Sequence, residues 1–251
     1  MPSLRDHAVV LRNQLLGESD RIVTVLTREH GKVRGVAKGV RKTTSRIGAR
    51  LEPFMVVDVQ WATGKSLDII QQVDMVGAYG PDISSDYDAY ATAQAMVEVA
   101  DQLTEHEATT AQFLLLVGGL RALAERAHPV ELIGDSYLLR ALSLAGWEPS
   151  VRDCAVTGEA GPHRHFVPTL GGVVSESVAP PGSLTPHAQS LELIAALLHG
   201  QWEVADAVDQ AHYGEVHAMV SAFTQFHLER GVRALAELTR LRQERIKEAR
   251  Q

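Results

Sequence analysis

GKVRGVAKGVRKTTSRIGARLEPF, residues 31–54, is the stretch that decides the fold of this 251-residue chain. It opens on a short valine-rich run that is typical of a β-strand, and near its end Pro53 is a turn signal before the next apolar run. Between them, residues 37–50 carry five Lys or Arg and no acidic residue, although the whole chain has a net charge of −7. A strand that leads into a basic loop predicts a small β-domain with a local positive surface.

Further runs of this kind lie on both sides, between Asp6 and about Met75. They are rich in β-branched residues and are separated by turn-forming stretches such as GESD, REHG and ATGK. Five short strands predict a small antiparallel barrel, for which the OB-fold is the commonest solution, although an SH3-like barrel would look similar. The predicted strands are HAVVLRNQLL (7–16), RIVTVLT (21–27), GKVRGVAK (31–38), PFMVVDVQW (53–61) and SLDIIQQVDM (66–75).

After Tyr79 the apolar residues recur at the three- and four-residue spacing of amphipathic helices, with Pro129 placed to start one helix and Gly200 to stop another. Residues 149–183 are rich in Gly and Pro and lack this period, so they predict a loop-rich insert with a small hairpin in HFVPTLGGVV. The predicted helical stretches are 88–103, 109–127, 129–147, 184–200, 202–210 and one long run from about Gly214 to Gln251.

Charge divides the chain at nearly the same place. Residues 1–80 hold 12 Lys or Arg against 8 Asp or Glu, whereas the remainder holds 12 against 23. This asymmetry predicts a basic module followed by an acidic one. The sequence therefore predicts an α+β multidomain fold, with a nucleic-acid-binding OB-fold barrel over residues 1–79 and an α-helical domain over residues 80–251.

Several classes of protein are disfavoured. The N-terminus lacks the apolar core of a signal peptide, and no apolar run reaches the roughly 18 to 20 residues of a membrane span, so a cytoplasmic location is expected. A single cysteine, Cys154, fits a reducing compartment. No nucleophile elbow, phosphate-cradling loop or zinc-protease motif is present, so the enzyme classes that depend on these motifs are disfavoured and no cofactor is expected.

The basic stretch has two interpretations. A charged loop on a small barrel is often only a solvated surface. The rest of the chain is acidic, however, and neighbouring strand positions are also cationic, which favours a groove that follows a phosphate backbone. Phe54 and Trp61 are expected in the core rather than as stacking platforms, so binding should be mostly electrostatic. The predicted DNA-binding residues are Arg21, Lys32, Arg34, Lys38, Arg41, Lys42, Arg46 and Arg50.

The order of residues in this region closely resembles the opening of RecO, a family of bacterial recombination mediators. There, a strand and a polar turn lead into a G-x-V-R-x-V-A-K-G-x-R segment and through a basic loop to L-x-P-F. The resemblance to actinobacterial members continues in DSYLLRALSLAGWEP (135–149), GPHRHF (161–166) and APPGS (179–183). The matching residues of the first region are Gly31, Val33, Arg34, Val36, Ala37, Lys38, Gly39, Arg41, Leu51, Pro53 and Phe54.

This resemblance implies an N-terminal OB-fold, a helical C-terminal domain and no chemical catalysis. It also implies DNA repair in the RecF pathway, because RecO proteins bind single- and double-stranded DNA and anneal complementary strands. They engage the acidic C-terminal tail of the single-stranded DNA-binding protein, and with RecR they let RecA load onto DNA which that protein coats. The expected location is the cytoplasm, in association with the nucleoid.

In zinc-bearing relatives the insert carries two Cys-x-x-Cys pairs, because tetrahedral zinc takes four soft ligands. Here the first pair reads Cys154 to Thr157 and the second reads Ser175 to Val178. Cys154 is the one zinc-type cysteine that remains, so a degenerate, metal-free zinc-finger-like insert is predicted over residues 149–183. A site that combines Cys154 with His163 or His165 is conceivable. The two histidines would point to opposite faces of a strand, however.

The helical domain offers fewer signals. A cation beside an apolar groove would suit an acidic, hydrophobic-ended tail, and Arg121, Arg126 and Arg140 lie beside apolar runs, so they are the candidates for partner-tail binding. The histidines of this region, His217 among them, are expected to be solvated or to cap helices.

Two alternatives to a recombination mediator remain open. An OB-fold RNA-binding or translation-associated adaptor would have the same charge pattern, because RNA has the same phosphate backbone. A metal-dependent hydrolase built on Cys154, His163 and His165 would need further ligands and a general base that the pattern lacks.

Overall fold

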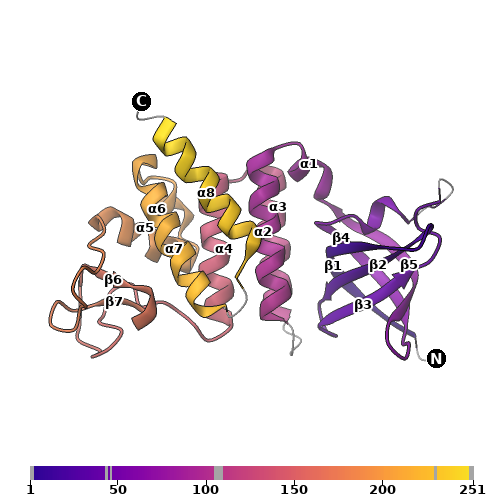
Figure 1. Cartoon of the computed structure of the whole chain (residues 1–251), viewed down its shortest axis with the longest axis horizontal. Helices are drawn as coiled ribbons and strands as arrows, with labels where there is room; N and C mark the ends of the chain where they lie inside the picture. Colours follow the sequence, from indigo (N-terminus) through magenta and orange to yellow (C-terminus); the bar gives the residue numbers. More distant parts are fainter. Residues whose placement is uncertain (1–2, 43–44, 46, 105–109, 229–230, 249–251) are drawn as a thin grey trace. The chain divides into compact units, whose positions relative to one another are not determined.

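The computed structural model of the chain describes residues 3–42, 45, 47–104, 110–228 and 231–248 (Figure 1). Its backbone contacts divide the chain into two compact units. The first unit comprises residues 1–93 and 97–127, and the second comprises residues 94–96 and 128–251. No helix in the described part of the chain is long and apolar enough to cross a membrane.

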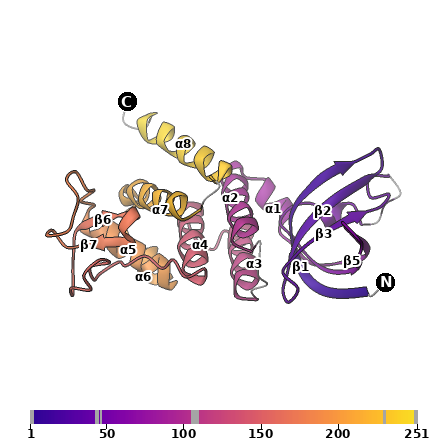
Figure 2. The ribbon, with the colours of Figure 1, turned by 60° about the horizontal axis from the view of Figure 1, so that its bottom comes forward.

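All five predicted strands form, and they close into a barrel (Figure 2), in which the strand order is β1-β2-β3-β5-β4. The pairs are antiparallel except β3 with β5, which run parallel. This closed five-stranded, OB-like barrel followed by helices confirms the predicted α+β class. The strands are β1 (Ser3–Leu16), β2 (Asp20–Thr27), β3 (Lys32–Ala37), β4 (Met55–Ala62) and β5 (Asp68–Ala78), with a short 3-10 helix (Ala49–Leu51) before β4.

The inside of the barrel is filled by one apolar cluster that draws on every strand, including Val10, Val23, Val33, Val57 and Ile70. The two aromatic residues of this region are buried as well: Trp61 belongs to the apolar cluster, and Phe54 packs edge-to-face against Tyr90. The side chains of Phe54 and Trp61 are each about 1% exposed, so neither offers a face to a nucleic-acid base.

Three helices complete the first unit, except for residues 94–96 of α2, which belong to the second: α1 (Gly80–Ser84), α2 (Tyr87–Leu103) and α3 (Thr110–Glu125). Asp86 caps α2, since its Oδ1 accepts the backbone N–H groups of Asp88 and Ala89 at 2.9 and 3.1 Å. Helix α3 contacts β1. The helices therefore pack against the outside of the barrel within this unit.

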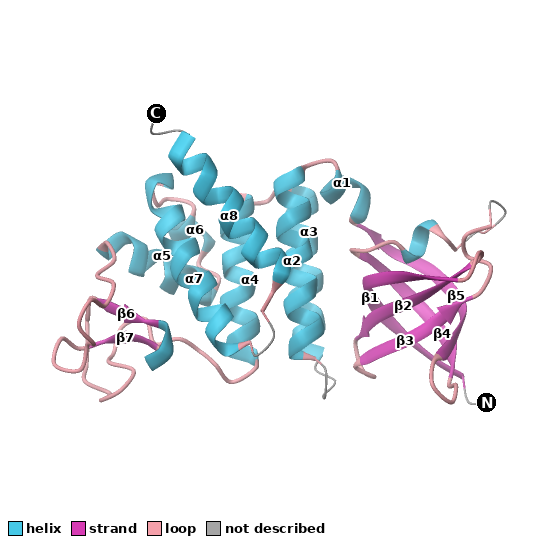
Figure 3. Ribbon diagram, viewed as in Figure 1, coloured by secondary structure: helices cyan, strands magenta, loops and turns pink. Residues whose placement is uncertain are grey.

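The second unit is mainly helical (Figure 3). Helix α4 packs against α5 and α7, and α7 packs against α8. The predicted hairpin of the insert forms as the antiparallel pair β6 (His165–Val167) and β7 (Gly172–Val174). Gly200 ends α5 in the left-handed conformation, at φ +67°, as predicted. The helices are α4 (Val130–Leu144), α5 (Ala188–His199), α6 (Trp202–Ala205), α7 (Tyr213–His227) and α8 (Arg233–Glu248).

The prediction of one long helical run from Gly214 to Gln251 is wrong. Helix α7 ends at an extended Leu228, and α8 begins at Arg233 beyond Gly231. Leu228 and Val232 flank the break and are 6% and 1% exposed. Burial of both apolar side chains stabilises the break, and the low helix propensity of Gly231 disfavours a continuous helix.

A buried polar cluster joins three helices of the second unit. His217 Nδ1 of α7 lies 2.7 Å from Asp135 Oδ1 of α4 and 2.7 Å from Arg242 Nη1 of α8. Its Nε2 lies 3.3 Å from the hydroxyl of Ser221 and 3.2 Å from that of Thr239. Because the His217 side chain is only 4% exposed, the expectation that it would be solvated or capping is wrong.

Candidate nucleic-acid interface

The predicted DNA-binding cations fall into two groups, and the first group is already paired. Arg21 Nη1 lies 2.6 Å from Glu52 Oε1, and Arg50 Nη1 donates to the carbonyl oxygen of Val73 at 2.6 Å and lies 3.4 Å from Asp74. Lys32 Nζ donates to Asp101 of α2, to Oδ1 at 2.8 Å and to the carbonyl oxygen at 2.7 Å. These three cations stabilise the fold of the first unit, and their charge is largely neutralised there.

The second group is exposed: Arg34, Lys38, Arg41 and Lys42. Among the described residues, none of the four forms a salt bridge. Arg34 Nη2 donates to Gln14 Oε1 at 3.2 Å, and Arg41 Nη1 donates to the carbonyl oxygen of Glu18 at 2.9 Å. These acceptors are neutral, so the arginines are positioned and their charge stays available to a ligand. Arg46 lies outside the described residues.

Asp20, the first residue of β2, fixes the start of the basic loop by hydrogen bonds. Asp20 Oδ1 accepts the backbone N–H of Gly39 at 2.7 Å and the hydroxyl of Ser19 at 2.8 Å. These bonds, and then the charges of Lys38 and Lys42, lower the pKa of Asp20 below the usual aspartate value. Gly39 has φ +63°, a conformation that favours glycine. Asp20 is therefore a positioning residue that the pattern of cations did not reveal.

Strand register shows which part of the outer barrel face is open. Val9, Leu26 and Lys32 oppose one another across β1, β2 and β3. Val9 and Leu26 are fully buried but do not belong to the apolar cluster inside the barrel, so they are covered from outside. Asp101 of α2 binds Lys32 at this end of the face.

The opposite end of the same face carries the exposed cations. Arg34 lies two residues further along β3 than Lys32, and the basic loop begins directly after Ala37. We call this part, from Arg34 to Lys42 together with the strand positions opposite it, the open end of the β1–β2–β3 face. In the first unit, helices thus cover one end of the face, and exposed cations without a salt bridge among the described residues are concentrated at the other end.

Comparison with known proteins decides the family. A profile described as Recombination protein O N terminal matches residues 1–79, and one described as Recombination protein O C terminal matches residues 84–236. This chain belongs to the RecO family. The predicted resemblance to the RecO family is thereby confirmed.

Individual RecO proteins match over nearly their whole length. The DNA repair protein RecO of Thermobifida fusca is 50% identical over 237 residues, which cover 94% of this chain and 98% of that protein. The DNA repair protein RecO of Streptomyces griseus is 48% identical over 243 residues, with the same two coverages. That of Cutibacterium acnes is 44% identical over 246 residues, which cover 96% of this chain and 100% of that protein.

In this member of the RecO family the two turns of the insert meet around Cys154. Its Sγ accepts the backbone N–H of Ser175 at 3.3 Å and that of Thr157 at 3.5 Å. Val178 packs against the small apolar cluster that Cys154 forms with Val167 and Val174. Burial raises the pKa of the thiol, but hydrogen bonds from the Thr157 side chain and from the backbone N–H groups of Ser175, Thr157 and Val156 outweigh this and lower it to about 6. Backbone N–H groups of both turns therefore stabilise a thiolate at Cys154.

The predicted metal alternative has no further support among the described residues. In that part of the chain, no group of three or more His, Cys, Asp or Glu side chains could hold a metal ion. His163 Nε2 lies 3.0 Å from the carbonyl oxygen of Glu159, and His165 Nδ1 lies 3.4 Å from the hydroxyl of Thr185. Both histidines thus have local partners. That the insert is metal-free stays a prediction.

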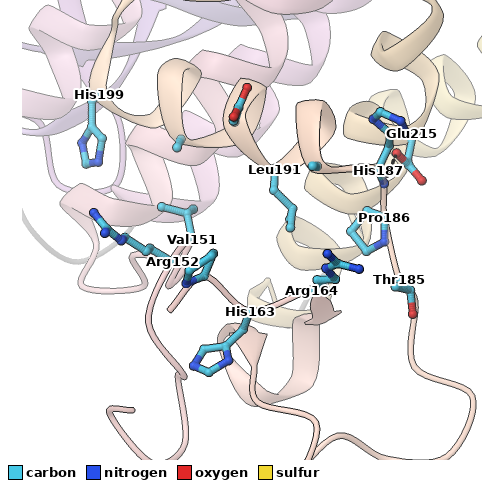
Figure 4. A pocket seen from close by; sticks show the side chains of 14 residues that line it. Val151, Arg152, His163, Arg164, Thr185, Pro186, His187, Leu191, His199 and Glu215 are labelled. Atoms are coloured by element: carbon cyan, nitrogen blue, oxygen red, sulfur yellow. Dashed lines mark hydrogen bonds between the residues drawn. The ribbon is translucent and has the colours of Figure 1, made fainter. Parts of the chain in front are cut away.

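The second unit also has a cleft of about 1140 Å³ between the insert and α5 (Figure 4). Its wall contains apolar side chains such as Val151, Leu191 and Ala195, and it contains the exposed Arg152 and Arg164. Among the described residues, neither arginine forms a salt bridge. The other lining residues are Pro162, His163, Thr185, Pro186, His187, Ala188, Glu192, His199 and Glu215.

The three arginines predicted for partner-tail binding are not grouped. Arg121 and Arg126 lie in the first unit, where Arg121 Nε is 2.8 Å from Glu125 and Arg126 Nη2 is 3.9 Å from Asp86. Arg140 lies in the second unit, half-buried next to Gly200 at the end of α5. The cleft residues Arg152 and Arg164 were missed by the sequence analysis because their apolar neighbours come from different segments of the chain.

Proposed function

We propose that this RecO-family protein takes part in DNA repair and recombination by holding nucleic acid at the open end of its barrel. The observation that carries the proposal is the group of four exposed cations, Arg34, Lys38, Arg41 and Lys42, which form no salt bridge among the described residues, in a chain of net charge −7. Such a surface attracts a phosphate backbone, and affinity comes from the release of counterions.

The finer proposal is that of a recombination mediator in the RecF pathway. The open end would bind single- and double-stranded DNA. By neutralising phosphates on two strands at once, it would remove the repulsion that keeps complementary strands apart, so annealing needs no nucleophile and no metal. With RecR, the protein would help RecA to load onto DNA coated by the single-stranded DNA-binding protein. It would act in the cytoplasm, in association with the nucleoid.

The corresponding division of labour follows the predicted domains. Residues 1–79 would bind the nucleic acid, and residues 80–251, with the insert at 149–183, would bind protein partners. The two family profiles, which meet between residues 79 and 84, support this proposal.

Annealing of two complementary labelled oligonucleotides, followed across a salt series, tests the function. The protein should accelerate annealing at low salt, and its affinity for single strands should fall with a slope of about −0.7 per neutralised phosphate in a plot of log K against log salt. No acceleration, or an affinity that is flat between low and moderate salt, would contradict the proposal. If RNA of the same sequence competes equally with single-stranded DNA, the RNA-binding adaptor is the better interpretation.

The acidic tail of the single-stranded DNA-binding protein would need a cation beside an apolar groove. The cleft between the insert and α5 combines both, through Arg152, Arg164 and its apolar wall. Arg121, in contrast, lies on an exposed helix surface and pairs with Glu125. We therefore propose that the tail binds in the cleft. The alternative is binding at Arg121, Arg126 or Arg140.

Charge reversal separates these two sites. The double substitution Arg152→Glu and Arg164→Glu should weaken binding of the partner's tail peptide by about tenfold or more, because two charge-assisted contacts turn repulsive. The matched pair Arg121→Glu and Arg126→Glu should leave the affinity unchanged. Fluorescence anisotropy of the labelled peptide measures both affinities. If only the Arg121 and Arg126 variant weakens binding, the tail binds at the alternative site.

A further inference from the structure

An apolar row crosses the outer face of the barrel at its open end. Ile22 of β2 opposes Val36 of β3, and Val36 opposes Ile69 of β5. Residues directly opposite one another in a sheet point to the same side. We call these three residues the aliphatic row.

The aliphatic row points away from the barrel interior. Its sequence neighbours Val23, Ala37 and Ile70 belong to the apolar cluster inside the barrel, and side chains alternate along a strand. None of the three row residues belongs to that cluster, and all three are half-buried rather than buried. The row is therefore a partly exposed strip of β-branched side chains on the outer surface.

Exposed cations lie beside this strip. Arg34 comes two residues before Val36 on the same strand, so it is on the same face, and its guanidinium bonds Gln14 of β1. Gln14 in turn opposes Ile22 at the end of the row. Lys38 follows two residues after Val36, just beyond the strand. A polyanion drawn to Arg34 and Lys38 would thus pass directly over the aliphatic row.

Charge also decides what kind of ligand would cover the row. Asp20, the acidic residue closest to it on β2, is already bonded to the backbone of the basic loop. A ligand with negative charges along its length and apolar faces between them fits this surface, and single-stranded nucleic acid has both. Since Phe54 and Trp61 are buried, the bases would meet aliphatic rather than aromatic side chains.

We propose that the aliphatic row of Ile22, Val36 and Ile69 is the surface on which the bases of a bound single strand lie. This inference rests on the proposed nucleic-acid-binding function and deepens it. The cations hold the phosphates and supply the salt-dependent part of the affinity, whereas the row removes apolar surface from water and supplies a salt-independent part. The pairing edges of the bases stay free for a complementary strand, since only their faces are covered.

An abasic oligonucleotide provides the test, because it keeps the phosphates and lacks the bases. The full-length protein should bind oligothymidylate about five- to tenfold more tightly than an abasic strand of equal length, less than several aromatic platforms would give. The two strands should share one salt slope, so their ratio should persist as salt rises. This comparison uses the wild-type protein and so does not depend on the folding of any variant.

Substitutions then locate the effect. Ile22→Thr with Val36→Thr keeps β-branched side chains in the strands and should bring the two affinities together without changing the salt slope. Val76→Thr is the matched control on β5, since Val76 is 53% exposed and lies seven residues beyond the row; it should leave the ratio as in the wild type. If the wild-type protein binds both strands with equal affinity, the proposed role of the aliphatic row is wrong and the proposed function stays intact. If the protein binds neither strand, the proposed function itself is wrong.

Discussion

Replacement of Arg34, Lys38, Arg41 and Lys42 with alanine is expected to weaken single-stranded DNA binding by roughly 10²- to 10³-fold at 0.1 M salt. The estimate follows from counterion release. Each phosphate contact on a single strand adds about 0.7 to the slope of log K against log salt, so loss of four contacts should reduce the slope by about three units. Fluorescence anisotropy of a labelled oligonucleotide across a salt series measures both quantities.

The paired cations supply the control for this experiment. Alanine at Arg21, Lys32 and Arg50 also removes positive charge from the first unit, but these side chains already bind Glu52, Asp101 and Asp74. The control variant should change the salt slope by less than about one unit and should instead lower the melting temperature, because it removes the hydrogen bonds that these side chains donate within the first unit, including those to the carbonyl oxygens of Asp101 and Val73. Similar losses of slope in both variants would mean that the division into free and paired cations does not govern binding.

The second large effect is expected in the buried cluster of the second unit. Arg242→Ala should lower the free energy of unfolding by about 3 kcal/mol, because it takes the cation from a buried cluster and leaves Asp135 and His217 behind. The Arg242 side chain is 13% exposed, and that of Asp135 is 1% exposed. Urea unfolding followed by helical circular dichroism gives the measurement.

Helix α8 itself provides the matched control. Arg240 lies two residues before Arg242 and forms an exposed pair with Glu237 at 3.0 Å. Exposed pairs of this kind contribute little, so Arg240→Ala should change the stability by no more than about 0.5 kcal/mol. Equal effects of the two substitutions would show that α8 is not held by the buried cluster.

Much of this protein could be predicted from local sequence. The five strands, the hairpin at residues 165–174 and the stop at Gly200 were all predicted, because side-chain period and turn residues are properties of a few neighbouring positions. The break between α7 and α8 was not predicted. Gly231 alone does not end a helix, and the burial of Leu228 and Val232 that favours the break depends on other helices.

The sequence by itself determined where the positive charge lies, that Phe54 and Trp61 would be core residues, and to which family the chain belongs. Only the tertiary structure decided which cations stay free. The partners of Arg21, Lys32 and Arg50 are Glu52, Asp101 and Asp74, which are 31, 69 and 24 residues away in the sequence. Whether a charge is available to a ligand depends on what the fold brings within bonding distance. For the same reason the burial of His217, the cleft beside α5 and the aliphatic row appeared only once the strands and helices were in place.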